Sequence, residues 1–535
     1  MSAAAVDTRP AATHAPVPGT PRRAMLALAR FEATRLLRHP LVILAALLFI
    51  GPWAAGQLTG TGDRHPVLQD ADTSPQLVAM LLLGGAAMVA ANLAVLRAHR
   101  HHADALLDVL VLPDPWRTGG FLLAVLPLGA VAAALAGLRI AVLAAAPAAA
   151  GRPSPWELLL YPAVVLLLGA AGVLLARLVR SVIFAPLALL GLAVASFGLL
   201  LPTTPGQSWL RWLLPVAAEP EPLRLPVDLM SRPAGRHLAY VCGLAVLAAV
   251  SALAASGARS RRLTAVAAAG LSVAVLAGSA QLLPHDAADK ARTAAVERPA
   301  EFQTCRRLDT VTYCAFPDFT PWIGAWDTVV RGVLRRVPED LARQPFAVRQ
   351  RIAGERPWEA GGTTSSREER AALAESWRRA DAAAGTPRAV VVGTSWGDGR
   401  SEISFAGSVA YEVVTHAGAA ADGVVCGARA VLVGWLAGQS TVETTAGLRE
   451  VDANSSGGVS FGDPRFGTPG MTVPDREMAV VRALLRRPGD QVAATVLASW
   501  AELSAATTPT ERVGDLFGVA VPPPVPEHER MVCTA

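Results

Sequence analysis

The chain has 535 residues, 52% of them hydrophobic, and a formal net charge of +5. Its mean hydropathy of +0.38 is too high for an ordinary soluble protein of this length. The basic residues lie between apolar segments rather than on one face of a soluble domain, so the charge does not predict nucleic-acid binding. We therefore expect a membrane protein of two or three domains, with lipids as partners and no nucleic acid.

Seven apolar segments fill the first half of the chain. Each approaches the roughly 20 apolar residues that cross a ~30 Å hydrocarbon layer as a helix. Lipid offers the backbone no hydrogen-bond partner, so these segments can cross it only as helices, whose backbone groups bond to one another. The predicted spans are about Leu41–Leu58, Gln76–Leu96, Phe121–Ala146, Leu158–Leu178, Val182–Leu201, Leu238–Ser256 and Leu263–Leu283.

Arginine placement predicts the orientation, because cytoplasmic segments carry an excess of basic residues. If the N-terminus is cytoplasmic, the inner segments carry fourteen arginines and the outer loops carry six. Seven spans then place residues 284–535 on the outer side. We expect a multi-pass protein of the plasma membrane with an extracytoplasmic C-terminal domain.

Cysteine usage agrees with this orientation. Four of the five cysteines, Cys305, Cys314, Cys426 and Cys533, lie in the region predicted to be outside. An even set in an oxidising compartment predicts two disulfides. The easiest closure joins Cys305 to Cys314 and leaves Cys426 with Cys533; four unpaired buried thiols are the alternative.

The fold class that follows is an α-helical polytopic membrane protein with a mainly α, minor β extracytoplasmic domain. Its predicted parts are a disordered N-terminus (1–20), an interfacial amphipathic helix (21–38), six spans (39–256), a seventh span (257–283) and the outer domain (284–535). The second of these, Pro21–Arg38, is basic on one face and apolar on the other, and is too polar to span.

Local signals in the outer domain predict several helices and one hairpin. Helical patterns cover Trp322–Val337, Glu368–Ala384 and Asp475–Arg487. Thr508 and Glu511 have capping-box spacing, and Gly518 is placed to end that helix. Turn formers between Ala389–Thr394 and Glu402–Ala406 predict a β-hairpin.

The sequence offers few candidates for chemistry. It has no phosphate-binding loop and no H-E-x-x-H zinc motif, and we expect no G-x-S-x-G nucleophile elbow. We therefore expect no catalytic site, no metal and no cofactor in this chain. Asn92 and Arg139 are polar residues deep in spans and are candidate pathway residues by default. For Arg139, which lies near an outer end, snorkelling to the interface is an equal alternative.

The longest polar stretch predicted to be inside joins the second and third spans. Within it, Ala103–Val111 is typical of a short helix, with leucines on one face and aspartates on the other, and prolines stop it. A rigid protrusion of this kind suits insertion into a cleft of another subunit; the alternative is an inner loop that merely connects two spans. The candidate coupling residues are Asp104, Leu106, Leu107, Asp108, Leu110 and Pro113.

The strings ALARFEATRLLRHP, before the first span, and DALLDVLVLPDPWRTGG, between the second and third, resemble the type-2 ABC exporter permeases. The resemblance covers Pro21–Ser256, and the seventh span and outer domain look like a module added in some actinobacterial permeases. It implies a transmembrane subunit that forms a translocation pathway as a homo- or heterodimer. It also implies that the coupling residues contact a separate ATPase subunit, which would hold ATP and Mg.

Two other classes of function remain open at this point. The main one is a membrane-anchored outer domain that binds a ligand or partner, with the spans as a scaffold or signalling element and no transport. A peptidase-like outer module is conceivable because some relatives of the family carry one, and the missing zinc motif counts against it.

Overall fold

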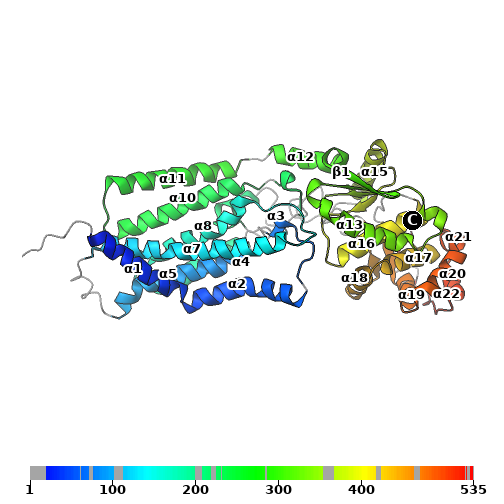
Figure 1. The fold of residues 1–535 in the computed structure, drawn as a ribbon, viewed down its shortest axis with the longest axis horizontal. Helices are drawn as coiled ribbons and strands as arrows, with labels where there is room; N and C mark the ends of the chain where they lie inside the picture. The colour runs from blue at the N-terminus through cyan, green and yellow to red at the C-terminus, as the bar shows by residue number, and fades with distance from the viewer. Residues whose placement is uncertain are drawn as a thin grey trace, which may run out of the picture.

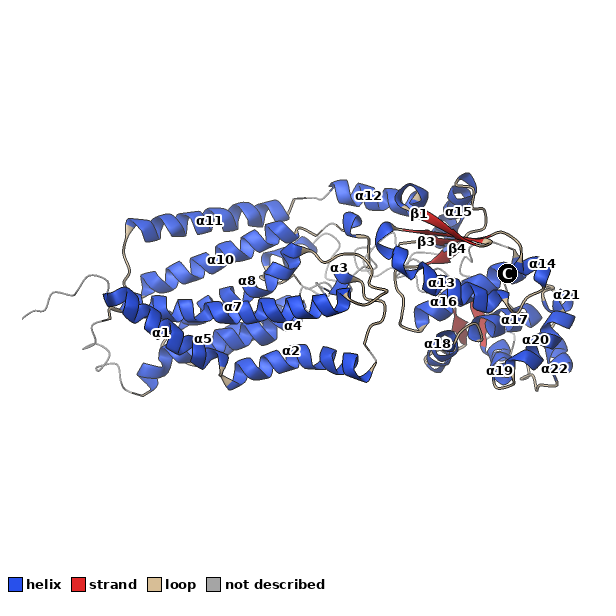
Figure 2. Cartoon of the chain, viewed as in Figure 1, coloured by secondary structure: helices blue, strands red, loops and turns tan. Residues whose placement is uncertain are grey.

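The computed structural model describes residues 20–60, 62–71, 76–101, 112–198, 208–217, 224–230, 232–283, 286–352, 367–416, 423–462, 470–524, 526 and 531–533. These residues form an elongated molecule (Figure 1). Long helices make a bundle at one end, and a region that contains the strands lies at the other (Figure 2).

The bundle is built from the first half of the chain. Its helices are α1 (Thr20–Leu37), α2 (Pro40–Thr59), α3 (Leu68–Ala71), α4 (Gln76–Ala79), a π-helical turn η1 (Met80–Gly84), α5 (Gly85–Arg100), α7 (Asp114–Ala144), α8 (Pro155–Leu178), α9 (Phe184–Gly198), α10 (Ala234–Ala255) and α11 (Arg261–Gln281). Two 3₁₀ turns, η2 (Ser208–Leu213) and η3 (Val227–Leu229), lie between α9 and α10.

Six helical segments in the described part of the chain are long and apolar enough to cross a membrane. They are Pro40–Thr59, Leu68–Arg97, Asp114–Ala144, Pro155–Leu178, Ala234–Ala255 and Arg261–Gln281, and within the second of them residues 72–75 lie outside the described residues. The predicted fifth span corresponds to α9, which has only 15 described residues. At 1.5 Å per residue, that length spans about 22 Å. A helical polytopic protein is therefore supported, and the count of seven spans stays a prediction.

The bundle has two distinct ends. At the first, which we call the α1 end, α1 packs against α5 and α7, and Arg97 at the end of α5 pairs with Glu32 of α1 at 2.9 Å. At the second, which we call the distal end, His237 of α10 contacts Gln281 of α11 at 3.0 Å. The C-terminal region packs against the distal end (Figure 1).

Small residues let the bundle helices approach closely. A Cβ at Gly172 of α8 would overlap the backbone of Met88 in α5. A Cβ at Gly243 of α10 would lie 2.9 Å from the carbonyl oxygen of Gly270 and 2.7 Å from the amide nitrogen of Ala274, both in α11. Close backbone approach through glycine and alanine is typical of helices that associate in lipid.

The C-terminal region contains two sheets. The larger has the order β1-β2-β3-β4, with β1 antiparallel to β2 and the other pairs parallel. Its strands are Thr304–Leu308, Val311–Ala315, Phe346–Gln350 and Val390–Val392, and the smaller sheet pairs β5 (Gly458–Ser460) with β6 (Thr472–Pro474). The helices are α12 (Asp286–Glu297), α13 (Ile323–Leu334), α14 (Glu339–Ala342), α15 (Arg367–Ala383), α16 (Arg400–Thr415), α17 (Gly427–Gly438), α18 (Val442–Ala453), α19 (Asp475–Leu485), α20 (Gly489–Ala498), α21 (Trp500–Leu503) and α22 (Thr510–Phe517), with 3₁₀ turns at Pro299–Phe302 and Pro317–Trp322.

The predicted hairpin of Ala389–Thr394 with Glu402–Ala406 is wrong. Val390–Val392 is buried throughout and pairs in parallel with β3, as a continuous apolar run can. Glu402–Ala406 lies in α16, where Asp398 accepts a hydrogen bond from the Ser401 amide at 2.7 Å. The glycines of the supposed turn therefore lead from a strand into a helix.

Two helix-boundary predictions have opposite outcomes. Gly518 ends α22 in the left-handed conformation, with φ 57°, as predicted. The capping box is wrong, because Pro509 occupies the N-cap and the Thr508 hydroxyl instead donates to the Glu502 carbonyl.

Both cysteine pairs lie at disulfide distance. Cys305 and Cys314 sit opposite each other on β1 and β2, with an S–S distance of 2.04 Å. Cys426 and Cys533 join the start of α17 to the last described residues of the chain, at 2.05 Å. These are the pairs expected from the sequence.

Candidate functional site

Most of the predicted coupling residues lie outside the described residues: Asp104, Leu106, Leu107, Asp108 and Leu110. Pro113 is described and is the N-cap residue of α7. The two helix ends that flank residues 102–111 are held at the α1 end of the bundle. Arg97 pairs with the buried Glu32, and Asp114 pairs with Arg117 and, at 4.0 Å, with Arg177.

Asn92 and Arg139 occupy different kinds of site. Asn92 is 1% exposed, and its Nδ2 donates to the Gly172 carbonyl at 3.2 Å. It therefore links α5 to α8 at their closest approach. Arg139 lies near the distal end and lines a cavity of about 290 Å³ together with Trp53, Asp63 and Asp70. Its Nη1 donates to the Ala71 carbonyl at 3.3 Å.

The distal end of the bundle also buries a polar belt that the sequence interpretation missed. Its members are Gln76, Glu157, Arg232, His237 and Gln281. Gln76 Nε2 donates to Glu157 Oε2, and Arg232 Nη1 lies 3.4 Å from Glu157 Oε1. His237 contacts Gln281 and the Pro215 carbonyl, and Gln281 donates to the Trp212 carbonyl. Four of these residues lie near the outer ends of predicted spans. Their similar depth in the membrane was the one feature of the sequence that could have predicted that they lie together.

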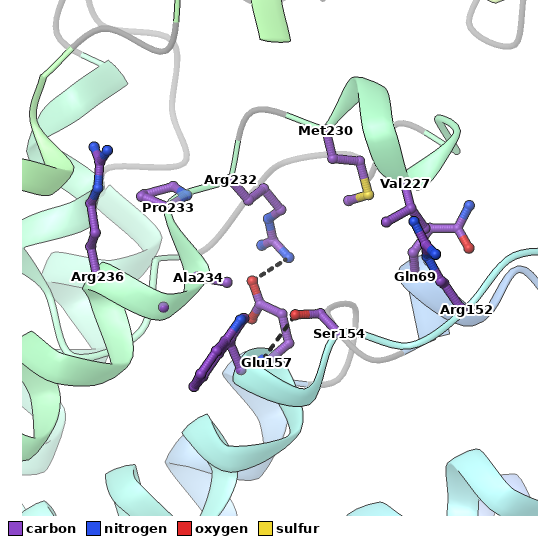
Figure 3. Close-up of a pocket in the computed structure, with 12 residues that line it drawn as sticks. Gln69, Arg152, Ser154, Glu157, Val227, Met230, Arg232, Pro233, Ala234 and Arg236 are labelled. Carbon is purple, nitrogen blue, oxygen red and sulfur yellow. Dashed lines mark hydrogen bonds and ion pairs between the residues drawn. The ribbon is translucent and has the colours of Figure 1, made fainter. Parts of the chain in front are cut away.

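A second cavity, of about 360 Å³, opens beside this belt where α8 and α10 begin (Figure 3). Twelve residues line it: Gln69, Arg152, Ser154, Trp156, Glu157, Val227, Met230, Arg232, Pro233, Ala234, Gly235 and Arg236. Glu157 points into the cavity toward Arg232, while Arg152 and Arg236 lie on opposite sides of it (Figure 3). We call this the arginine cavity.

The distal connections of the bundle share a hydrophobic core with the C-terminal region. Val67, Ala150, Leu225 and Leu229 belong to the same buried cluster as the tryptophans of that region. Trp322 Nε1 donates to the Ala148 carbonyl at 2.8 Å. Three separate connections of the bundle are therefore packed into one junction.

Polar and aromatic contacts complete this junction. Arg224 Nη1 donates to Ser395 Oγ at 2.8 Å. The His65 ring makes edge contacts with two tryptophans, with its centroid 6.3 Å from that of Trp322 and 6.5 Å from that of Trp396. Burial lowers the pKa of His65 below its ordinary value, with a smaller opposing effect from Asp63.

Ser395 also corrects the expectation that the chain has no catalytic motif, because Gly393–Gly397 reads G-x-S-x-G between β4 and α16. The motif gives a nucleophile only on a strained strand-to-helix turn with a base in reach. The backbone at Ser395 is not in the positive-φ region. Its hydroxyl is held by Arg224 and by Asp398, at 2.8 and 3.1 Å, and the side chain is 3% exposed. In the described structure this serine is part of the junction.

The C-terminal region contains a buried ionic cluster of its own. Asp381 pairs with Arg349 at 2.8 Å and with Arg351 at 2.6 Å, and all three side chains are at most 2% exposed. Burial lowers the pKa of Arg351 to about 10 and raises that of Asp381. Two guanidinium groups thus share one carboxylate.

No set of three histidine, cysteine, aspartate or glutamate residues that could hold a metal occurs in the described part of the chain. Comparisons of the whole chain with family models, with curated proteins and with solved structures find no match.

Proposed function

We propose that this chain is the transmembrane subunit of an ATP-binding-cassette exporter, coupled to a separate ATPase subunit. ATP and Mg would be held by that partner. In this proposal the α1 end faces the cytoplasm, the distal end faces the outside, and the pathway lies between two permease chains.

The observation that carries the proposal is the arrangement of the α1 end. The basic helix α1 packs against α5 and α7, and Glu32, at 5% side-chain exposure, binds Arg97 there. Helix α5 ends and helix α7 begins at the end opposite to the C-terminal region, and residues 102–113 join them in the sequence. A partner that pushed on this connection would act directly on α5 and α7, which are central helices of the bundle.

The arrangement of the distal end supports the same function. The connections that follow α2, α7 and α9 are packed into the junction with the C-terminal region. A displacement of the bundle helices would therefore be transmitted to that region, and Arg139 would lie at the exit of the path, in a polar cavity.

The test is purification of the tagged chain from its native membranes, followed by identification of a bound ABC ATPase and measurement of its activity. Double substitution Leu107→Asp with Leu110→Asp should abolish co-purification and remove any stimulation of ATP hydrolysis. The matched control is Leu58→Asp, because Leu58 is an apolar residue, 89% exposed, at the distal end of α2. Retention of the ATPase by the double variant would refute the coupling role.

The shared core at the junction favours one second candidate, a membrane-bound partner-binding protein in which the bundle positions the C-terminal region. It requires no ATPase. Co-purification of the chain from native membranes with a partner protein but without any ATPase would favour this second candidate over the exporter proposal.

A further inference from the structure

We propose that the arginine cavity binds the phosphate of an anionic lipid headgroup, with the acyl chains lying along α8. The proposal depends on the bundle crossing a membrane and does not depend on transport or on an ATPase. The cavity volume of about 360 Å³ falls within the roughly 300–1,000 Å³ of small-molecule sites.

The charges of the lining favour an anion. Three arginines line the cavity together with a single carboxylate, that of Glu157. Arg236 Nη1 donates to the Ala280 carbonyl at 2.8 Å, a contact that does not neutralise its charge. Glu157 is buried and is already bound by Arg232, so it offsets only that arginine. Arg152 pairs with Asp228, but both side chains are well exposed, at 66% and 86%, and such pairs contribute little. Arg152 and Arg236 therefore leave the cavity with an excess of positive charge.

The backbone adds to this preference. Both α8 and α10 begin at the cavity, so the positive ends of two helix dipoles point toward it. Ser154 caps α8, whereas Pro233, the N-cap residue of α10, supplies no side-chain acceptor. The first turn of α10 thus offers amide donors of the kind that bind phosphate groups.

The surroundings point to a lipid rather than a soluble anion. Trp156 lines the cavity and is 54% exposed, and Leu159, one turn further along α8, is 50% exposed. A tryptophan beside an exposed apolar helix face is typical of a membrane–water interface. A phosphate held in the cavity would place its acyl chains on that apolar face.

One further lining group suggests a hydroxylated headgroup. Gln69 is 2% exposed and donates its amide to the Leu225 carbonyl at 2.8 Å. Its Oε1 has no hydrogen-bond donor among the described residues. A headgroup that carries both a phosphate and a hydroxyl, such as phosphatidylglycerol, would satisfy the arginines and this acceptor together.

The experiment uses the full chain, delipidated in detergent, with a tail-labelled short-chain phosphatidylglycerol followed by fluorescence anisotropy. Phosphatidylcholine and inorganic phosphate are the comparison ligands. Arg152→Gln and Arg236→Gln should each weaken phosphatidylglycerol binding about fivefold, the effect of one basic residue near a charged surface. Arg262→Gln, at the α1 end, removes an exposed arginine of the same kind and should leave binding unchanged.

Trp156→Ala separates the two sources of phosphate. It should weaken phosphatidylglycerol binding and leave the weak binding of inorganic phosphate as it was. Equal binding of phosphatidylcholine and phosphatidylglycerol, or equal effects of all three arginine variants, would overturn the proposal. Inorganic phosphate that binds as tightly as the lipid would overturn the lipid as the ligand. Thermal unfolding of each variant checks that the substituted protein is still folded.

Discussion

The bundle and the C-terminal region differ in how they treat large apolar side chains. Large apolar residues are exposed almost exclusively in the bundle, and among the described residues only Val442, Leu497, Met531 and Val532 of this kind are exposed after residue 284. The largest fully buried side chains, including Trp322, Trp326, Trp377 and Trp435, all lie in the C-terminal region.

This contrast is the one expected if the bundle lies in lipid and the C-terminal region lies in water. In water, burial of large apolar side chains stabilises the fold, and the C-terminal region follows that rule. In lipid, large apolar side chains gain nothing from burial, and helices associate through small residues instead. The buried alanines of the bundle, such as Ala87, Ala90, Ala124 and Ala132, follow the second rule. The same comparison suggests substitutions whose effects should differ between the two regions.

The largest effect is expected where bundle backbones touch. Gly172→Leu should prevent α5 and α8 from packing, because the new side chain would overlap the Met88 backbone, which cannot rotate away. We expect a loss of at least about 5 kcal/mol, enough to unfold a domain of ordinary stability. Gly191→Leu in α9 is the control, since nothing lies within 4 Å of its Cβ position. Size-exclusion chromatography and thermal unfolding in detergent compare the two variants. Equal loss of stability in Gly172→Leu and Gly191→Leu would contradict packing of the helices through small residues.

The second effect concerns the disulfides, which occur only in the C-terminal region of the described chain. Cys426 and Cys533 are 107 residues apart, whereas Cys305 and Cys314 are 9 apart. Loop-closure entropy predicts a loss of about 5 kcal/mol for Cys533→Ser and about 3 kcal/mol for Cys314→Ser. Denaturant unfolding of the two variants compares them, and a larger loss for Cys314→Ser would contradict the entropic account. Non-reducing peptide mapping of the native protein should recover both pairs.

Sequence patterns predicted the long helices better than the contacts between residues of different helices. The apolar runs gave the helices of the bundle because a membrane span is continuous in sequence. The sequence interpretation did not identify Glu157 and His237 as site residues. Their hydrogen bonds are made with residues of other helices, Gln76 and Gln281, which a pattern along one segment does not reveal. The hairpin prediction failed at Gly397–Gly399, where the turn residues lead into α16 and the strand partner of Val390–Val392 is the distant β3.

The third effect separates buried from exposed ion pairs in the C-terminal region. Asp381→Asn leaves the guanidinium groups of Arg349 and Arg351 buried without a countercharge among the described residues, which typically costs 3–5 kcal/mol, so we expect about 4 kcal/mol. Asp490→Asn breaks the pair with Arg336, in which Asp490 is 93% exposed, and should cost less than about 1 kcal/mol. Denaturant midpoints measure the difference, and similar losses would show that burial does not control it.

The smallest effect tests the junction where the two regions meet. Because burial lowers the pKa of His65, the packed junction binds a proton less readily than an opened one, whose histidine has a pKa near 6.5. Stability of the junction should therefore be full above pH 6.5 and should fall as the pH drops below it. Asp63 and Glu443 favour the protonated ring and Arg64 opposes it, so the loss should be less than about 1 kcal/mol. Limited proteolysis between pH 7.5 and 5.5 measures opening of the junction.

The variant His65→Gln isolates this contribution, since it keeps a polar side chain beside Trp322 and Trp396 but removes the titration. Its proteolysis should depend less on pH than that of the native chain. His101→Gln, at the exposed α1 end, should keep the native pH dependence. If both variants keep it, carboxylates elsewhere control the junction. If only His65→Gln loses it, the two regions are held together in part by a neutral histidine that contacts two tryptophans of the C-terminal region.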